Sequence, residues 1–295
     1  MSVRILSHFV LLLLWLLHFL PLPVLAICGK SLGFMFYFVG MRRRKIVLVN
    51  LALCFPNLAE KERTSLARAH FKMLGRSFLE RSKLWWASED ELRRLIHVSG
   101  ENHIKEALNA GKAVILLAPH FVGLDAGGIG IALRFDAMSM YSTQKNAVFD
   151  ALILRGRKRF NAQLLLSRQD GILKTIKAMK KGLPFYYLPD MDLGREDALF
   201  APFFGVKAAT ITGLPRLAKV ANAVIITCVT RILENGKGYE VTLEKAWENF
   251  PTEDVFKDTC RMNDFIEHAV KTMPEQYYWV HRRFKTRPQG EEKFY

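Results

Sequence analysis

Short apolar runs alternate with amphipathic segments along most of this chain, and this alternation limits the fold more than any other feature. The runs at 113–117, 137–141, 184–188 and 224–229 have the length of strands and few polar residues. Between them lie segments such as 146–160, where apolar residues recur at helical spacing. Strands that alternate with helices form parallel sheets covered on both faces. The sequence therefore predicts an α/β fold with a central, mostly parallel sheet flanked by helices.

The same patterns predict the remaining elements. A long amphipathic segment, 57–84, is expected to form one or two helices, and His70 within it lies among charged residues and is expected to face solvent. Glycines that follow apolar-periodic segments mark the ends of two helices. Further helices are predicted at 99–112, 171–181, 208–223 and 253–273, a further strand at 163–166, and an edge strand at 239–243.

The N-terminal segment predicts a membrane anchor. Residues 5–28 contain no charged side chain, and about 20 apolar residues are enough to cross a bilayer. A basic run at 42–45 follows, against the single Arg4 on the other side, so the positive-inside rule keeps the rest of the chain in the cytoplasm. A cleaved signal peptide is the alternative, but the charge lies on the wrong flank and an Ala-x-Ala site is missing. We expect an anchor with a basic flank at 1–45, single-pass or monotopic, and a cytoplasm-facing domain at 46–295.

Composition narrows the class of partner. The chain has 43 lysine and arginine residues against 28 acidic ones, a net charge of +15, which suits nucleic acid, an anionic membrane surface or acidic partners. The sequence shows no zinc-finger spacing and no RNA-binding aromatic motif, so no nucleic acid is expected. The cysteines, Cys28, Cys54, Cys228 and Cys260, are far apart and are expected to be free thiols in a reducing compartment.

One strand leads into a candidate catalytic site. The run 113–117 is followed by His120 and then by Asp125. Residues five apart on an unbroken helix point about 140° away from each other, so a contact between them requires a turn, which Pro119 and Gly123 supply. An imidazole held by a carboxylate is a general base that takes a proton from a hydroxyl near neutral pH. A histidine with a structural role only is the alternative.

Other features of the sequence indicate which type of reaction this site would catalyse. The sequence contains no Gly-x-Ser-x-Gly elbow and no cysteine beside His120, so the proton would come from the substrate, which indicates transfer of a group onto an alcohol. No second histidine or cysteine lies at ligand spacing, so no metal site is predicted. Arg157 lies in a cluster of four cations at 155–159, more than a helix end requires, which suggests an anionic ligand. Asp190 follows the strand at 184–188, again at a strand end.

With these residues assembled, the chain resembles the late (secondary) acyltransferases of lipid A biosynthesis, of the lauroyl and myristoyl type. They belong to the wider His-x4-Asp/Glu glycerolipid acyltransferase superfamily. The resemblance runs from residue 50 to the end, and its most specific part is Pro-Glu-Gln-Tyr-Tyr-Trp-Val-His-Arg-Arg-Phe-Lys-Thr-Arg-Pro at 274–288. Other matching blocks are Gly156-Arg157, Ser-Arg-Gln-Asp at 167–170 and Leu-Pro-Asp-Met-Asp at 188–192. Asp125 departs from the lipid A enzymes, which often carry glutamate there.

The resemblance implies roles for five residues. His120 would be the catalytic base and Asp125 the carboxylate that orients it, while Arg157, Asp190 and Arg168 would bind substrate. It also implies a fatty acyl chain on acyl carrier protein as donor, a hydroxyl of an acyl chain on a lipid A precursor as acceptor, and the inner membrane as location. No cofactor is expected.

Two alternatives remain at this point. One is a glycerophospholipid acyltransferase of the lysophosphatidate type, in the same superfamily. The other is a non-catalytic, membrane-anchored basic binding protein, for which Arg282 and Arg283 in the tail would matter and His120 would not.

Overall fold

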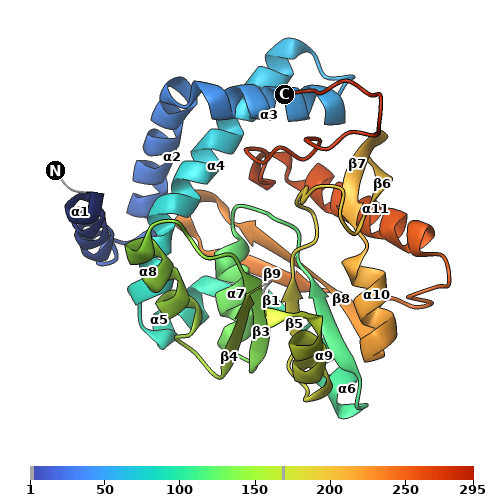
Figure 1. Cartoon of the computed structure of the whole chain (residues 1–295). Coiled ribbons are helices and arrows are strands. Elements are labelled where there is room, and N and C mark those ends of the chain that lie inside the picture. The colour runs from blue at the N-terminus through green and yellow to red at the C-terminus, as the bar shows by residue number, and fades with distance from the viewer. Residues whose placement is uncertain (1–2, 168–169) are drawn as a thin grey trace.

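The computed structural model describes residues 3–167 and 170–295. Within these residues the central sheet has seven strands in the order β1-β9-β8-β2-β5-β3-β4 (Figure 1). All neighbouring strands run parallel except β8 and β9, which are antiparallel. The predicted α/β fold with a mostly parallel sheet is confirmed. The strands are β1 Ile96–Ser99, β2 Ala113–Leu117, β3 Ala137–Tyr141, β4 Gln163–Ser167, β5 Phe185–Tyr187, β8 Ala223–Ile232 and β9 Tyr239–Leu243, and a separate hairpin pairs β6 Ala198–Phe203 with β7 Val206–Ile211.

Helices precede, connect and cover the strands. Figure 1 shows α2, α3 and α4 at one end of the molecule, with the C-terminus beside α3. The helices are α1 Val3–Leu17, α2 Leu22–Val39, α3 Met41–Cys54, α4 Glu60–Trp86, α5 Glu89–Leu95, α6 Glu101–Asn109, α7 Leu124–Ala132, α8 Ala147–Arg157, α9 Ile172–Lys180, α10 Gly213–Ala221 and α11 Val255–Thr272, with short 3-10 turns at Glu234–Gly236 and Pro274–Gln276.

Strand β2 lies at the centre of the sheet and all five of its residues are buried. Ile115 and Leu117 pack in a core cluster with residues of α9, α10 and α11. Val114 and Leu116 face the opposite cluster, which contains residues of α6 and α7. Both faces of β2 are thus covered, which is why the strand is a continuous apolar run. In such sheets, ligands bind at the C-terminal ends of the central strands.

Two of the predicted elements are wrong. The strand at 239–243 is not at an edge, because β9 lies between β1 and β8. The helix predicted at 208–223 begins with β7, and α10 starts only at Gly213. Alanine favours helix, but Ala208 and Ala209 are buried and pair with β6, so tertiary contacts override the intrinsic preference.

Glycines bring α2 into close contact with α4. A Cβ atom on Gly33 would lie 2.1 Å from the backbone oxygen of Phe71, and one on Gly75 would lie 2.2 Å from that of Gly29. The opposite face of α2 is exposed, and α2 has the length and hydropathy of a membrane-spanning helix. The division expected at residue 45 falls inside α3.

Substitution of Gly33 by valine is expected to destabilise the fold by about 3 kcal/mol, at the upper end of the usual cost of overpacking. The new side chain would meet backbone atoms of α4, which cannot rotate away as a side chain would. Thermal and denaturant unfolding of the detergent-solubilised protein would measure the loss. Ser31→Val is the matched control, because it adds bulk to the exposed face of the same helix. Equal stability of the two variants would contradict the close packing.

Candidate active site

His120 and Asp190 form a hydrogen-bonded pair at the C-terminal edge of the sheet. The ring Nδ1 of His120 lies 2.7 Å from Oδ1 of Asp190, and the backbone N–H of His120 donates to Oδ2 at 2.9 Å. The carboxylate side chain is fully buried, whereas the imidazole is 18% exposed. Because an ionised carboxylate only accepts hydrogen bonds, the neutral ring carries its proton on Nδ1 and leaves Nε2 as an acceptor.

Strand register explains this pair. Strands β2 and β5 are parallel neighbours, with Leu117 opposite Tyr187. His120 follows Leu117 by three residues and Asp190 follows Tyr187 by three residues. The two chains leave the sheet side by side, and the backbone N–H of Ala118 still bonds Tyr187. His120 and Asp190 therefore meet because they lie at equivalent positions beyond two adjacent strands.

Asp125 does not hold His120 in the way the sequence predicted. Its Oδ2 accepts from Nε of Arg81 at 2.7 Å, and its Oδ1 accepts from Nη2 of Arg157 at 3.3 Å. Asp125 lies in the first turn of α7, and that helix directs its carboxylate to α4 and α8. The carboxylate on Nδ1 of His120 is instead that of Asp190, which was expected to bind substrate. The predicted contact between His120 and Asp125 is therefore wrong.

Charge keeps both acids ionised. Burial would raise the pKa of Asp190, but the charge and hydrogen bonds of His120, together with the Tyr277 hydroxyl, lower it to about 2. Burial likewise opposes ionisation of Asp125, but Arg81 and Arg157 lower its pKa to about 2. Both carboxylates are therefore ionised at neutral pH, Asp190 beside the imidazole of His120 and Asp125 between two guanidinium groups.

The C-terminal signature at 274–288 forms backbone hydrogen bonds with the turn that contains His120. The backbone N–H of Tyr278 donates to the carbonyl of His120 at 2.9 Å, and that of Val122 donates to the carbonyl of Gln276 at 2.8 Å. Phe121 and Tyr277 form a β-bridge. Tyr277 is thus a site residue that the sequence did not single out, although its block carried the resemblance.

The two remaining histidines near the site have structural roles. Nε2 of His281 accepts from the backbone N–H of Asp192 at 2.9 Å, and burial together with the charge of Arg283 lowers the pKa of His281 to about 4. His70 is fully buried, which corrects the expected exposure, and its Nδ1 lies 3.1 Å from the carbonyl of Glu275. Both rings contact backbone groups, whereas the ring of His120 contacts a buried carboxylate.

The basic cluster at the end of α8 divides into separate roles. Arg159 donates to the carbonyls of Leu84 and Ala87 and so closes the end of α4. Gly156 lies on Trp85, because a Cβ there would be 2.5 Å from the indole ring. This close approach of α8 to α4 lets Arg157 reach the acid that Arg81 also contacts. Arg168, the fifth predicted site residue, lies outside the described residues.

Part of the basic tail is buried in the core. Arg283 is buried and donates to the carbonyl of Ala209 at 2.8 Å and to the hydroxyl of Thr210 at 2.9 Å. Asn50 on α3 donates to the carbonyls of Trp279 and His281, both at 2.7 Å. Arg283 therefore fixes the tail to β7 rather than facing a polyanion, which removes a main support of the binding-protein alternative.

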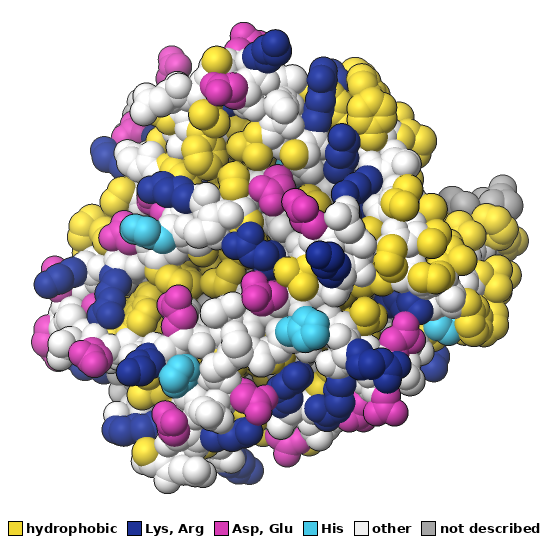
Figure 2. Space-filling model, turned by 180° about the vertical axis from the view of Figure 1, so that it is seen from behind, with side chains coloured by type: hydrophobic (Ala, Val, Ile, Leu, Met, Phe, Trp, Pro, Cys, Tyr) yellow, Lys and Arg dark blue, Asp and Glu magenta, His cyan; other side chains and the backbone are white. Residues whose placement is uncertain are grey.

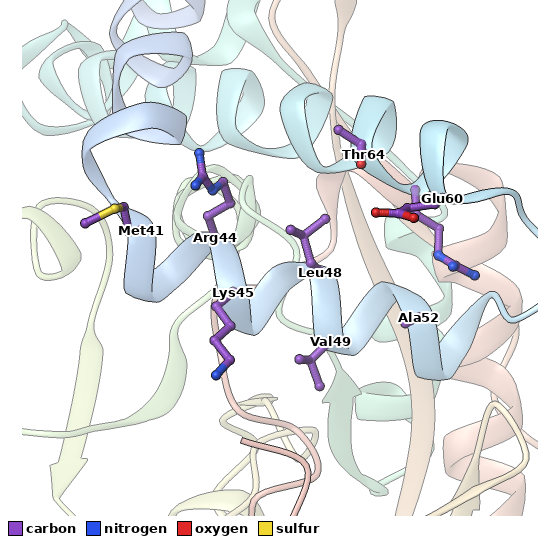
Figure 3. Close-up of a pocket in the computed structure, with 9 residues that line it drawn as sticks. Met41, Arg44, Lys45, Leu48, Val49, Ala52, Glu60 and Thr64 are labelled. Atoms are coloured by element: carbon purple, nitrogen blue, oxygen red, sulfur yellow. The ribbon is translucent and has the colours of Figure 1, made fainter.

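A groove of about 430 Å³ lies away from this site, between α3 and the start of α4. Figure 3 shows Arg44 and Leu48 pointing toward α4, which carries Thr64. The lining contains none of the candidate site residues; it consists of Met41, Arg44, Lys45, Leu48, Val49, Ala52, Glu60, Arg63 and Thr64. Over residues 3–167 and 170–295, no group of three or more His, Cys, Asp or Glu side chains is arranged to hold a metal ion.

Comparison with known proteins identifies the family of this chain. Residues 1–286 match the family described as bacterial lipid A biosynthesis acyltransferase. The chain is 35% identical to the lipid A biosynthesis lauroyltransferase of Escherichia coli K12 over 278 residues, 94% of this chain and 90% of the relative. It is 33% identical to the palmitoleoyltransferase of that strain over 291 residues (98% and 94%) and 30% identical to its myristoyltransferase over 272 residues (91% and 82%). This chain belongs to the bacterial lipid A biosynthesis acyltransferase family.

Proposed function

We propose that this protein transfers a fatty acyl chain from acyl carrier protein to a hydroxyl of an acyl chain on a lipid A precursor. The observation that carries the proposal is the partly exposed imidazole of His120, held by the buried carboxylate of Asp190 at the C-terminal edge of the central strand. Family membership supplies the class of reaction, and the pair supplies a base of the kind that the reaction needs.

The reaction begins with the free nitrogen of His120. With its proton on Nδ1, the ring uses Nε2 to take the proton of the acceptor hydroxyl. The resulting alkoxide attacks the thioester carbonyl, and the tetrahedral intermediate expels the carrier thiolate, which recovers the proton from the imidazolium. Asp190 fixes the tautomer and stabilises the imidazolium, as the acid of a Ser-His-Asp triad does. It takes the role that was predicted for Asp125.

The exposed N-terminal surface supports a membrane location. Figure 2 shows hydrophobic side chains gathered on the side of the molecule that carries α1 and α2. At one end of this surface, Arg44 and Arg68 lie over the ring of Tyr37 at 5.1 and 5.6 Å. The ring of Tyr37 is itself buried, but lysine and arginine side chains beside an exposed apolar surface suit the headgroup level of a bilayer. The exposed residues are Ile5, Phe9, Leu12, Leu13, Trp15, Leu16, Phe19, Val24, Ile27, Phe34, Met35, Phe38, Val39 and Met41.

The charge of the chain supports an acidic donor protein. Its net charge is +15, and acyl carrier proteins are acidic, so long-range attraction would raise the rate of encounter. With a cytoplasmic carrier, the site would lie on the cytoplasmic side of the inner membrane.

Offering purified protein the choice of acceptor would test the function. With acyl carrier protein loaded with a single acyl chain, we expect a lipid A precursor to gain the mass of one ester-linked chain. Lysophosphatidate should remain unchanged. Acylation of lysophosphatidate alone would favour the glycerophospholipid alternative, and absence of both products with folded protein would favour a binding protein. Lipid A from cells lacking the protein should lose one secondary chain, whose mass identifies the donor.

A further inference from the structure

Asp125 is surrounded by more positive charge than it can balance. One carboxylate faces two guanidinium groups, Arg81 at 2.7 Å and Arg157 at 3.3 Å, so the group carries a net charge of +1. Among the contacts of the described residues, each of these arginines makes one hydrogen bond, to Asp125. A guanidinium has five N–H donors. Most donors of both arginines thus remain available.

The arginines face outward while the acid lies beneath them. The side chains of Arg81 and Arg157 are 30% and 31% exposed, whereas that of Asp125 is 16% exposed. The acid lies in the first turn of α7, which begins directly after the turn that contains His120. An anion held by these arginines would therefore be close to the candidate base.

We propose that Arg81 and Arg157 together bind a phosphate group of the substrate, and that Asp125 is a positioning residue that holds the two guanidinium groups side by side. Planar guanidinium groups match the oxygens of a phosphate in pairs. The inference rests on the proposed acyl transfer and extends it, because it assigns a phosphate site beside the reacting hydroxyl. Phosphate occurs both on lipid A precursors and on the prosthetic arm of the carrier, so the two sources must be separated by experiment.

Steady-state kinetics of the Arg81→Gln variant distinguishes the phosphate of the acceptor from that of the carrier. We expect the KM for the phosphorylated acceptor to rise roughly 10- to 100-fold, as for loss of hydrogen bonds to a charged group, with kcat changed only a few-fold. The KM for the acyl carrier protein should remain constant. With an acceptor from which the relevant phosphate has been removed, wild type and variant should behave alike. A rise confined to the KM for the carrier would assign the site to the prosthetic arm instead.

Conservative variants and a matched control complete the test. Arg81→Lys keeps the charge without the planar fork and should lie between wild type and Arg81→Gln. Asp125→Asn should raise the KM for the phosphorylated acceptor. If Asp125 instead oriented His120, the same substitution would lower kcat and change the pH profile of kcat. Arg94→Gln removes an exposed arginine elsewhere on the surface and should leave both constants unchanged.

Equilibrium binding distinguishes failure of this proposal from failure of the proposed function. If wild type acylates the lipid A precursor but Arg81→Gln binds it normally, the phosphate site is wrong and acyl transfer stands. If Arg81→Gln weakens binding of the dephosphorylated acceptor, relative to wild type, as much as binding of the phosphorylated one, Arg81 has a structural role only and the proposal fails. If wild type binds the phosphorylated lipid but transfers no acyl chain, the function is wrong and the anion site stands.

Discussion

Replacement of His120 by alanine is expected to lower kcat of acyl transfer by about 10³-fold, within the range that a general base contributes. The alkoxide would then have to form without an acceptor for its proton. The fold should survive, because Asp190 keeps its hydrogen bond from the backbone N–H at residue 120. Single-turnover rates with preformed acyl carrier protein would measure the effect on chemistry alone.

His97→Ala is the control for that measurement. His97 is an exposed histidine on β1, at the edge of the sheet, and its loss should leave the rate unchanged. A His120→Ala protein that is folded and retains more than about a tenth of the wild-type rate would remove His120 from the mechanism, because a general base contributes at least 10²-fold.

Asp190→Asn should cost at least as much, about 10³- to 10⁴-fold in kcat. An amide in place of the carboxylate can present N–H to Nδ1, and the ring then carries its proton on Nε2, where it cannot act as a base; the same change in a serine protease triad shows the scale. Because the two residues act as one unit, the His120→Ala/Asp190→Asn double variant should be no slower than the slower single variant.

The matched control is another buried aspartate. Asp258 is equally buried, and its carboxylate accepts from the backbone N–H and the hydroxyl of Thr252, not from the histidine turn. Asp258→Asn should therefore affect stability but not kcat. If Asp125→Asn lowered kcat by 10³-fold and Asp190→Asn did not, the sequence-based assignment of the orienting acid would be right after all.

Local patterns predicted the sheet and the helices well, because burial on both faces leaves a clear mark in the sequence. Strand β2 is apolar throughout, and α8 has its apolar residues at helical spacing. Errors occurred where contacts distant in sequence decide the structure. Ala208 and Ala209 pair with β6, and the carbonyl of Ala209 accepts a hydrogen bond from Arg283 in the tail. These contacts override the helix preference of alanine.

The sequence proposed candidate site residues but not the contacts between them. His120 and Asp190 each followed an apolar run, and their pairing required only that β2 and β5 be neighbours. Nothing local specifies that order, since β3 and β4 lie between them in the chain. Arg81 had no signal at all, because one arginine among many on a charged helix becomes distinctive only when the neighbouring elements are placed.

Helix α4 connects the apolar N-terminus to the chemistry over a very short span. Gly75 packs against α2, Ser77 donates to the carbonyl of Val122 at 2.6 Å, and Arg81 reaches Asp125. Six residues of helix cover about 9 Å. If α2 lies in the bilayer, the acceptor hydroxyl would react within about a nanometre of the lipid boundary. An acceptor could then arrive by lateral diffusion and be modified without ever being extracted into water.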